Sequence, residues 1–259
     1  MKIAFSPCPN DTFVFHALVH GLIPGAPAFE VMFADVDVTN TAALDGRFDI
    51  VKVSYAALPW LLDQYELLPC GGALGRGCGP LLVTKPGAAV RKIAVPGERT
   101  TAYLLFRLWA TQFYDIEVVP FHEIMPGVAT GRFDAGLVIH EARFTYPGYG
   151  LVSLVDLGQW WEETTGSPIP LGAILAKPEI AAPATEWIRA SVRHAWADPD
   201  ASRAYVQEHA QEMDPAVQKQ HIALYVNDFT EDLGPAGYDA ARTLLAQAAQ
   251  AGLVPRVEI

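Results

Sequence analysis

One pattern restricts the possible folds of this chain more than any other: the series strand, helix, strand, helix, strand occurs twice. The first series covers residues 2–54 and the second covers residues 93–139, and in each a short helix ends in the letters GRFD, at Gly46–Asp49 and at Gly131–Asp134. The glycine suits a helix C-terminus, where a left-handed backbone is needed. Alternating strands and helices favour a mostly parallel sheet with helices on its faces. The sequence therefore predicts two similar α/β units, whether the shared letters reflect duplication or coincidence.

Two further apolar strands predict how the units are connected. We expect the chain to leave the first unit through residues 80–85, to build the second, and to return through residues 170–177. The chain from residue 180 to residue 252 has the periodicity of helices throughout. The predicted fold is α/β with two lobes, a mixed sheet in each lobe, a two-strand hinge and a helical C-terminal segment. The predicted larger lobe comprises residues 1–85 and 178–259, and the smaller lobe residues 86–177.

The charge of the chain argues against a nucleic-acid surface. The 259 residues carry 29 acidic and 18 basic side chains, a net charge of −11, whereas phosphate backbones are bound by clustered Lys and Arg. No apolar run is long enough to cross a bilayer, and Pro7 and Pro9 interrupt the N-terminal segment before a signal-peptide core of ordinary length. We expect a cytoplasmic protein with no membrane or nucleic-acid partner, and this charge does not exclude a small anionic ligand.

Polar residues follow several of the predicted strands. In open α/β sheets, ligands bind beyond the carboxyl ends of the strands, and a cleft between two lobes is a common place for a small molecule. Four segments of this chain lie at such positions: Ser6–Asp11, Lys52–Tyr55, Pro96–Ala102 and His140–Arg143. We therefore predict one binding site to which all four segments contribute.

His140 is the leading catalytic candidate. It directly follows the apolar run Ala135–Ile139, and an imidazole with an ordinary pKa of about 6.5 can accept a proton near neutral pH. A packed structural histidine is the alternative interpretation. Glu141 or Arg143 could orient His140, or the two could form a structural ion pair.

The other candidates point to binding. Thr100 and Thr101 open a predicted helix, whose free amides suit a carboxylate, although an ordinary N-cap would need only one threonine. Lys52 interrupts an apolar strand, which costs free energy unless the ammonium reaches water, a partner or a ligand. Asp11 and Asn40 stand where each could cap a short helix, and both are weaker binding candidates.

No pattern in the chain predicts a metal or a nucleotide cofactor. Cys8, Cys70 and Cys78 lack zinc-ligand spacing, and His16 and His20 have no accompanying third ligand. The stretch GGALGRGCG lacks the Lys and Ser/Thr of a phosphate-binding loop. We expect neither a cofactor nor a metal.

At these residues the sequence resembles the 1,4-dihydroxy-6-naphthoate synthase family of the futalosine route to menaquinone. The matching stretches are SPCPNDTF, KVSYAAL, GGALGRGCGPLLV, VPGERTTAY, GLVIHEARFTYPGYGLV, DLGQWWEE and PLGAILA. The resemblance implies a fold similar to type II periplasmic binding proteins. It also implies a cofactor-free reaction, the conversion of cyclic dehypoxanthine futalosine to 1,4-dihydroxy-6-naphthoate with loss of the sugar-derived fragment.

The same resemblance implies roles for individual residues. The histidine of the family's IHE motif is taken as the proton acceptor, and His140 occupies that position. The family's substrate contacts lie in its K-x-S and TTA stretches, which correspond here to Lys52, Val53, Ser54, Thr100, Thr101 and Ala102.

Two other functions are compatible with such a fold. One is a cytoplasmic protein that only binds a small molecule, since fold alone does not determine function. The other is the related enzyme that dehydrates chorismate, although the histidine of IHEARFTY argues against it. We favour the naphthoate synthase because its aromatic product would drive proton loss and carbon–carbon cleavage, a reaction that a single base can begin.

Overall fold

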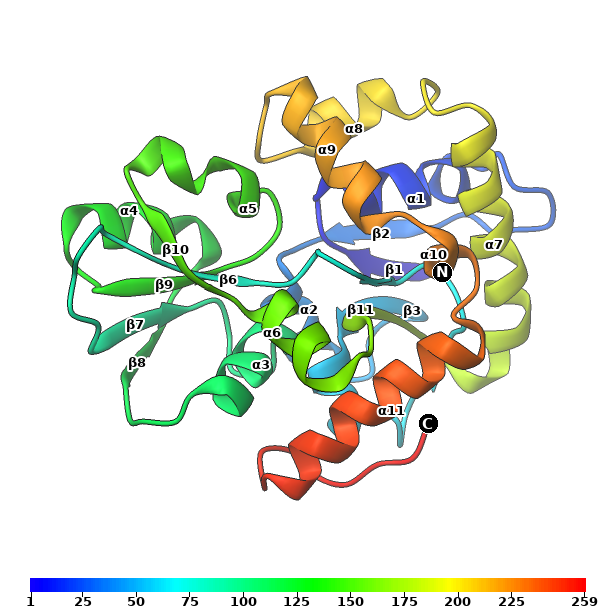
Figure 1. Ribbon diagram of the computed structural model, residues 1–259. Coiled ribbons are helices and arrows are strands. Elements are labelled where there is room, and N and C mark those ends of the chain that lie inside the picture. The colour runs from blue at the N-terminus through cyan, green and yellow to red at the C-terminus, as the bar shows by residue number, and fades with distance from the viewer.

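The computed structural model describes residues 1–259 and contains two mixed β-sheets (Figure 1). Sheet A has the order β2-β1-β3-β11-β4, with β5 paired to β11, and sheet B has the order β10-β6-β9-β7-β8. The strands of sheet A are β1 (Lys2–Phe5), β2 (Glu30–Phe33), β3 (Ile50–Ser54), β4 (Glu66–Leu67), β5 (Ala73–Gly75) and β11 (Ile169–Ala176). Those of sheet B are β6 (Leu81–Thr84), β7 (Lys92–Val95), β8 (Asp115–Val118), β9 (Ala135–Val138) and β10 (Val152–Asp156).

Both sheets combine parallel and antiparallel pairs in the same way. In sheet A, β1 is parallel to β2 and β3, whereas β11 is antiparallel to β3. In sheet B, β7 is parallel to β8 and β9, whereas β6 is antiparallel to β9. The predicted α/β fold with a mixed sheet in each lobe is therefore confirmed.

Helices surround the two sheets (Figure 1). They are α1 (Pro9–Val19), α2 (Val36–Ala43), α3 (Thr101–Trp109), α4 (Phe121–Thr130), α5 (Ala142–Thr145), α6 (Leu157–Thr165), α7 (Ala181–Ala197), α8 (Arg203–His209), α9 (Pro215–Tyr225), α10 (Asp228–Glu231) and α11 (Gly234–Gln250). Three short 3₁₀ helices are η1 (Tyr55–Trp60), η2 (Tyr146–Tyr149) and η3 (Pro178–Ile180). The helical C-terminal segment is thus confirmed, and none of these helices has the length and apolar character needed to span a membrane.

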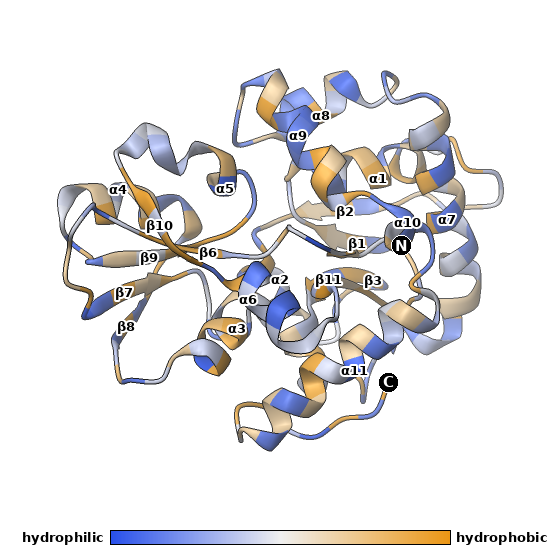
Figure 2. Cartoon of the chain, in the orientation of Figure 1, coloured by the Kyte–Doolittle hydropathy of each residue, from blue (hydrophilic) through white to orange (hydrophobic).

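Sheet A separates two hydrophobic cores because successive side chains of a strand point to opposite faces. Ile50 of β3 packs into the cluster that contains α1 and α7, whereas its neighbour Val51 packs into the cluster that contains α2 and α11. Figure 2 shows the corresponding pattern in α11, where hydrophobic and hydrophilic residues alternate along the helix. Burial on both faces explains why β3 carries the apolar residues Ile50, Val51 and Val53.

The two GRFD segments have the same structural role in the two sheets. Gly46 and Gly131 follow α2 and α4 with positive φ angles of 65° and 84°, which glycine adopts without strain. The Asp49 carboxylate accepts a hydrogen bond from the Lys2 amide at 2.6 Å, and Asp134 accepts one from the Lys92 amide at 2.8 Å. Each aspartate therefore ties the start of one strand to the start of its parallel neighbour.

The chain crosses between the sheets where Gly79 meets Gly158. A Cβ atom added to Gly79 would lie 2.2 Å from the Cα atom of Gly158, so no side chain fits there. The chain crosses earlier than at the predicted boundaries, which followed residues 85 and 177. The strand β6 already belongs to sheet B, and the strand β11 already belongs to sheet A. Each of these strands satisfies its backbone hydrogen bonds within one sheet and is not shared by the two.

One local prediction was wrong. Asn40 lies inside α2, which begins at Val36, and therefore does not cap a helix. After β3 the chain forms the short 3₁₀ helix η1, which contains Pro59. Pro59 has no amide hydrogen to donate, which disfavours a longer α-helix here.

Candidate active site

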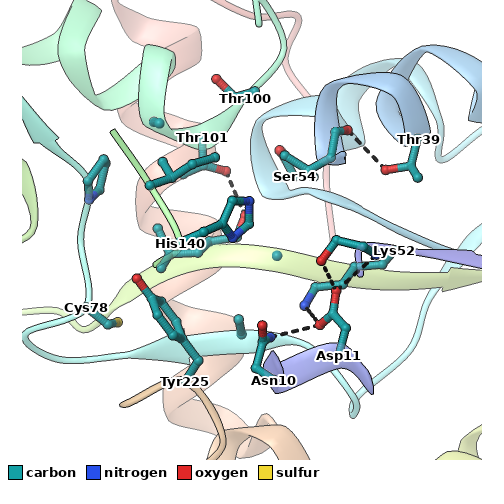
Figure 3. A pocket seen from close by; sticks show the side chains of 18 of the residues that line it. Asn10, Asp11, Thr39, Lys52, Ser54, Cys78, Thr100, Thr101, His140 and Tyr225 are labelled. Carbon is teal, nitrogen blue, oxygen red and sulfur yellow. Dashed lines mark hydrogen bonds and ion pairs between the residues drawn. The ribbon is translucent and has the colours of Figure 1, made fainter. Parts of the chain in front are cut away.

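All four predicted segments meet at one pocket between the two sheets (Figure 3). The space between its walls and its opening to solvent together amount to about 650 Å³. Its lining includes Ser6, Asn10, Asp11, Lys52, Ser54, Thr100, Thr101, Ala102, Ile139 and His140. These residues follow β1, β3, β7 and β9, so the pocket lies at the carboxyl ends of parallel strands, as expected for an α/β sheet.

Two of the predicted site residues do not line the pocket. Val53 is fully buried in the hydrophobic core because it points to the opposite face of β3 from Lys52 and Ser54. Asn40 is also fully buried, and its side chain supports the pocket wall from behind. It accepts a hydrogen bond from the Ser54 amide at 2.7 Å and donates to the Ser54 hydroxyl oxygen at 3.1 Å. The Ser54 hydroxyl hydrogen is therefore free to face a ligand.

Asn40 also links the two lobes. Its Nδ2 atom lies 3.2 Å from the Arg99 carbonyl oxygen, in the turn that precedes α3. The Thr101 hydroxyl makes a second link, since it donates to the Leu171 carbonyl at 3.0 Å and accepts from the Ala56 amide at 3.2 Å. The start of α3 is thus held against sheet A by two buried polar residues.

The start of α3 presents an anion-binding surface to the pocket. Thr100 is the N-cap, and its hydroxyl accepts a hydrogen bond from the Tyr103 amide at 3.2 Å. The amides of Thr101 and Ala102 donate to no protein acceptor, and both residues line the pocket. Free amides at a helix N-terminus favour a carboxylate or another small anion.

Lys52 and Asp11 form a buried ion pair in the pocket wall. Asp11 also accepts hydrogen bonds from the Ser6 hydroxyl at 2.7 Å and from the Asn10 side-chain amide at 2.8 Å. The lysine in the middle of an apolar strand is therefore explained by a carboxylate from α1, which pairs with its charge.

His140 lies among these groups with its ring in the pocket (Figure 3). It is the one non-glycine residue with a positive φ angle, 52°, a strained conformation that is often found at functional sites. Burial lowers the pKa of His140 to about 4, with the Asp11 charge acting in the opposite direction. The imidazole is therefore neutral near pH 7 and has a nitrogen lone pair available to accept a proton.

Arg143 does not orient His140. Its guanidinium donates to the Gly79 carbonyl and to the Asp156 carboxylate, both at 2.6 Å. Asp156 in turn accepts from the Gly158 amide at the start of α6 at 2.9 Å. Arg143 therefore anchors the segment after His140 to the crossing between the sheets.

Glu141 is buried close to His140. Burial raises the pKa of the Glu141 carboxyl to about 7. Donor atoms of Cys8, His140 and Glu141 lie within 4.8 Å of one another, so the carboxyl group is close to the imidazole.

Sequence reasoning missed the contribution of α9 to the pocket. His221 and Tyr225, four residues apart on this helix, both line the pocket. This spacing placed them on one helix face, but only the packing of α9 against α1 carries that face to the carboxyl ends of the strands.

Comparison with known proteins identifies the family of this chain. The model of a menaquinone biosynthesis family matches residues 1–250. A 1,4-dihydroxy-6-naphthoate synthase from Streptomyces coelicolor is 62% identical, with 98% of this chain and 95% of that protein covered. A 1,4-dihydroxy-6-naphthoate synthase from Thermus thermophilus is 47% identical with the same coverage.

Solved structures place the fold. A protein from Archaeoglobus fulgidus is 30% identical, with a TM-score of 0.92 and 98% of each chain covered. The alkanesulfonate-binding protein of Xanthomonas axonopodis is 12% identical, with a TM-score of 0.73 and coverage of 99% of this chain and 94% of that one, so it shows the fold alone. The predicted likeness to periplasmic binding proteins is confirmed, and the chain belongs to the menaquinone biosynthesis family, with close relatives that are named 1,4-dihydroxy-6-naphthoate synthase.

Proposed function

We propose that this protein is a carbon–carbon lyase that converts cyclic dehypoxanthine futalosine to 1,4-dihydroxy-6-naphthoate. The names of its relatives support the product, and the pocket supports the chemistry. Its wall offers the neutral imidazole of His140, the hydroxyl of Ser54 and the amides of a helix N-terminus. Together these can hold a small anionic substrate and remove one proton from it.

The substrate carboxylate is placed at the free amides of Thr101 and Ala102, where the dipole of α3 stabilises a negative charge. The Ser54 hydroxyl donates a second hydrogen bond to the substrate. Both donors belong to elements that Asn40 and Thr101 hold together, so the substrate is oriented by a rigid surface. Closure of the two lobes over the pocket would exclude water from the reacting bond.

His140 then acts as the base. Its ring nitrogen takes the proton, and the electron pair of the broken C–H bond stays on the substrate. There it drives cleavage of the carbon–carbon bond, whose electron pair leaves with the sugar-derived fragment. Formation of the aromatic naphthoate ring makes this sequence favourable. No metal or cofactor is needed for any of these steps.

The observation on which this proposal chiefly rests is the state of His140. It lines the pocket from a strained left-handed backbone and makes no side-chain hydrogen bond to the protein. The ring is only partly buried, so its nitrogens remain accessible to a ligand in the pocket. The pKa of about 4 keeps the ring unprotonated at neutral pH.

The test is turnover of purified protein with cyclic dehypoxanthine futalosine, followed by chromatography with mass detection. His140→Asn is the informative variant, because asparagine tolerates a positive φ angle whereas most residues do not. We expect kcat to fall by about 10²–10⁴-fold, the usual contribution of a general base. His122→Asn, an exposed histidine in α4, is the matched control and should retain wild-type turnover.

Near-normal turnover by His140→Asn would exclude His140 as the base. Folded wild-type protein that binds the substrate in calorimetry and releases no naphthoate would instead identify a small-molecule binding protein. Dehydration of chorismate by the wild type would identify the related enzyme.

A further inference from the structure

Glu141 and His221 form a buried pair that none of the steps above uses. Their exposed fractions are 5% and 0%, and His221 Nδ1 lies 3.8 Å from a Glu141 carboxyl oxygen. His221 Nδ1 and the other Glu141 oxygen, Oε1, have no hydrogen-bond partner in the protein. Buried polar atoms nearly always have a hydrogen-bond partner, so the unpartnered atoms of these two neighbouring side chains need an explanation.

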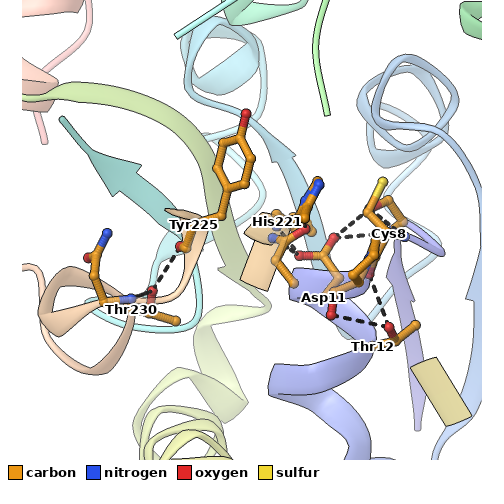
Figure 4. Close-up of polar contacts among 11 residues, drawn as sticks. Cys8, Asp11, Thr12, His221, Tyr225 and Thr230 are labelled. Carbon is orange, nitrogen blue, oxygen red and sulfur yellow. Dashed lines mark hydrogen bonds and ion pairs between the residues drawn. The ribbon is translucent and has the colours of Figure 1, made fainter. Parts of the chain in front are cut away.

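The tautomer of His221 follows from its neighbours. Asp11 only accepts hydrogen bonds, so the Asn10 side chain must turn its Nδ2 group toward Asp11, at 2.8 Å. The Asn10 oxygen then faces His221 Nε2 at 2.9 Å, and Nε2 must carry the proton. Burial holds the pKa of His221 well below its usual value, so the ring is neutral and Nδ1 is a lone-pair acceptor. Figure 4 shows His221 extending toward the segment that carries Cys8 and Asp11.

Glu141 therefore lies between two imidazoles. On one side is the Nδ1 acceptor of His221, toward which a protonated carboxyl group can donate. On the other side, a ring nitrogen of His140 lies within 4.8 Å of a Glu141 oxygen. The rings of His140 and His221 are themselves nearly parallel, with 17° between their planes and 6.3 Å between their centroids. The chain of contacts runs from Asp11 through Asn10, His221 and Glu141 to His140.

We propose that Glu141 is a positioning residue that balances the charge of His140 when His140 takes the substrate proton, and that Asn10 and His221 hold Glu141 for this role. The inference rests on the proposed function of His140. An imidazolium in this enclosed pocket needs a nearby anion, because desolvation disfavours the charged ring. The ionised Glu141 carboxylate supplies that anion, and its protonated form, which lies 3.8 Å from His221 Nδ1, does not.

Several titratable groups lie around Glu141 and the two imidazoles on the surrounding elements. They are Cys8 and Asp11 at the start of α1, Lys52 on β3, Glu212 before α9, and His221 and Tyr225 on α9. Hydrogen bonds from the Glu141 amide and from the Cys8 side chain lower the Glu141 pKa, whereas the Asp11 and Glu212 charges add to the effect of burial and raise it. Lys52 is paired with Asp11, which leaves Glu141 without a cation of its own in the resting protein.

The experiment compares the wild type with Glu141→Gln, Glu141→Asp and His221→Gln across pH 5–9. In the wild type, kcat should rise with pH through about 7 as Glu141 ionises. Glu141→Gln should lower kcat about 100-fold, leave KM within about threefold and lose this rise. Glu141→Asp should restore part of kcat together with a pH-dependent rise. In His221→Gln, kcat should still rise with pH, but at a pH other than 7. Glu163→Gln changes an exposed residue and should behave as the wild type.

A second readout needs no substrate. NMR of histidine-labelled protein, with the two signals assigned through His140→Asn and His221→Gln, should show both rings responding to one ionisation near pH 7 in the wild type. Neither ring should respond in Glu141→Gln. If the wild type makes no naphthoate but both rings still respond together, the proposed function is contradicted. The coupling of Glu141 to the two histidines is then still supported. Normal kcat with an unchanged pH profile in Glu141→Gln, or a His140 ring that ignores Glu141, would overturn the inference.

Discussion

Lys52 and Asp11 pair inside the pocket wall with side-chain exposures of 9% and 1%. The pair joins the strand β3 to the start of α1, two elements whose sequences are 41 residues apart. Because both charges are nearly removed from water, each depends on the other for its stability. The pair therefore links folding of the larger lobe to the shape of the pocket.

Breaking this pair should destabilise the fold. Asp11→Asn leaves the Lys52 ammonium buried without a counter-charge, and we expect a loss of about 3 kcal/mol in the free energy of unfolding. Urea denaturation measured by circular dichroism checks this value. Asp200→Asn, which removes an exposed partner of Arg203, is the control and should change stability by less than about 0.5 kcal/mol. Equal effects of the two variants would contradict the importance of burial.

Ser54→Ala should weaken substrate binding more than it slows the reaction. It removes the hydroxyl that faces the pocket while Asn40 keeps its hydrogen bond to the residue 54 amide. The lost hydrogen bond to an anionic substrate corresponds to an increase in KM of about tenfold, with kcat within about twofold. Steady-state kinetics at pH 7.5 measure both constants. A fall in kcat with KM unchanged would instead place Ser54 at the reacting bond.

The Glu141 carboxyl group should make stability depend on pH. Its pKa is about 7 in the folded protein against an ordinary value of 4.5, so between these pH values the native state keeps a proton that the unfolded chain releases. Stability from this group is present below pH 4.5 and is lost as pH rises toward 7, by at most about 3 kcal/mol.

The lowered pKa of His140 acts in the opposite direction between about pH 4 and 6.5, so the wild-type profile alone does not separate the two groups. The informative quantity is the stability of Glu141→Gln minus that of the wild type, from urea unfolding at pH 5 and pH 7.5. We expect this difference to favour the variant more at pH 7.5. A difference that is independent of pH would show that Glu141 titrates normally.

Gly79→Ala should disturb the crossing between the sheets. The new methyl group would lie 2.2 Å from the Cα atom of Gly158, and backbone on both sides would have to move. We expect a loss of about 2 kcal/mol in stability, as for other overpacked sites, and reduced turnover because Arg143 binds the Gly79 carbonyl. Gly148→Ala is the control, because a Cβ atom at Gly148 would have no heavy atom within 4 Å. Equal melting temperatures for the Gly79 and Gly148 variants would argue against a close crossing.

The sequence by itself determined the two α/β units, because burial on both faces makes strands apolar and the helix ends carry glycine at Gly46 and Gly131. It also located the polar ends of the strands, so Lys52, Ser54, Thr100 and His140 could be assigned to one pocket. These features depend on local periodicity and on the rule that ligands bind at the carboxyl ends of parallel strands.

Only the tertiary structure decided what each polar side chain faces. Asn40 supports Ser54 from behind, Val53 points into the core, and Arg143 binds Asp156 and leaves His140 free. His221 reaches the pocket from a helix about 80 residues downstream of His140, a distance that no local pattern spans. These outcomes depend on how separate elements pack, and packing is set by long-range contacts that a single sequence does not display.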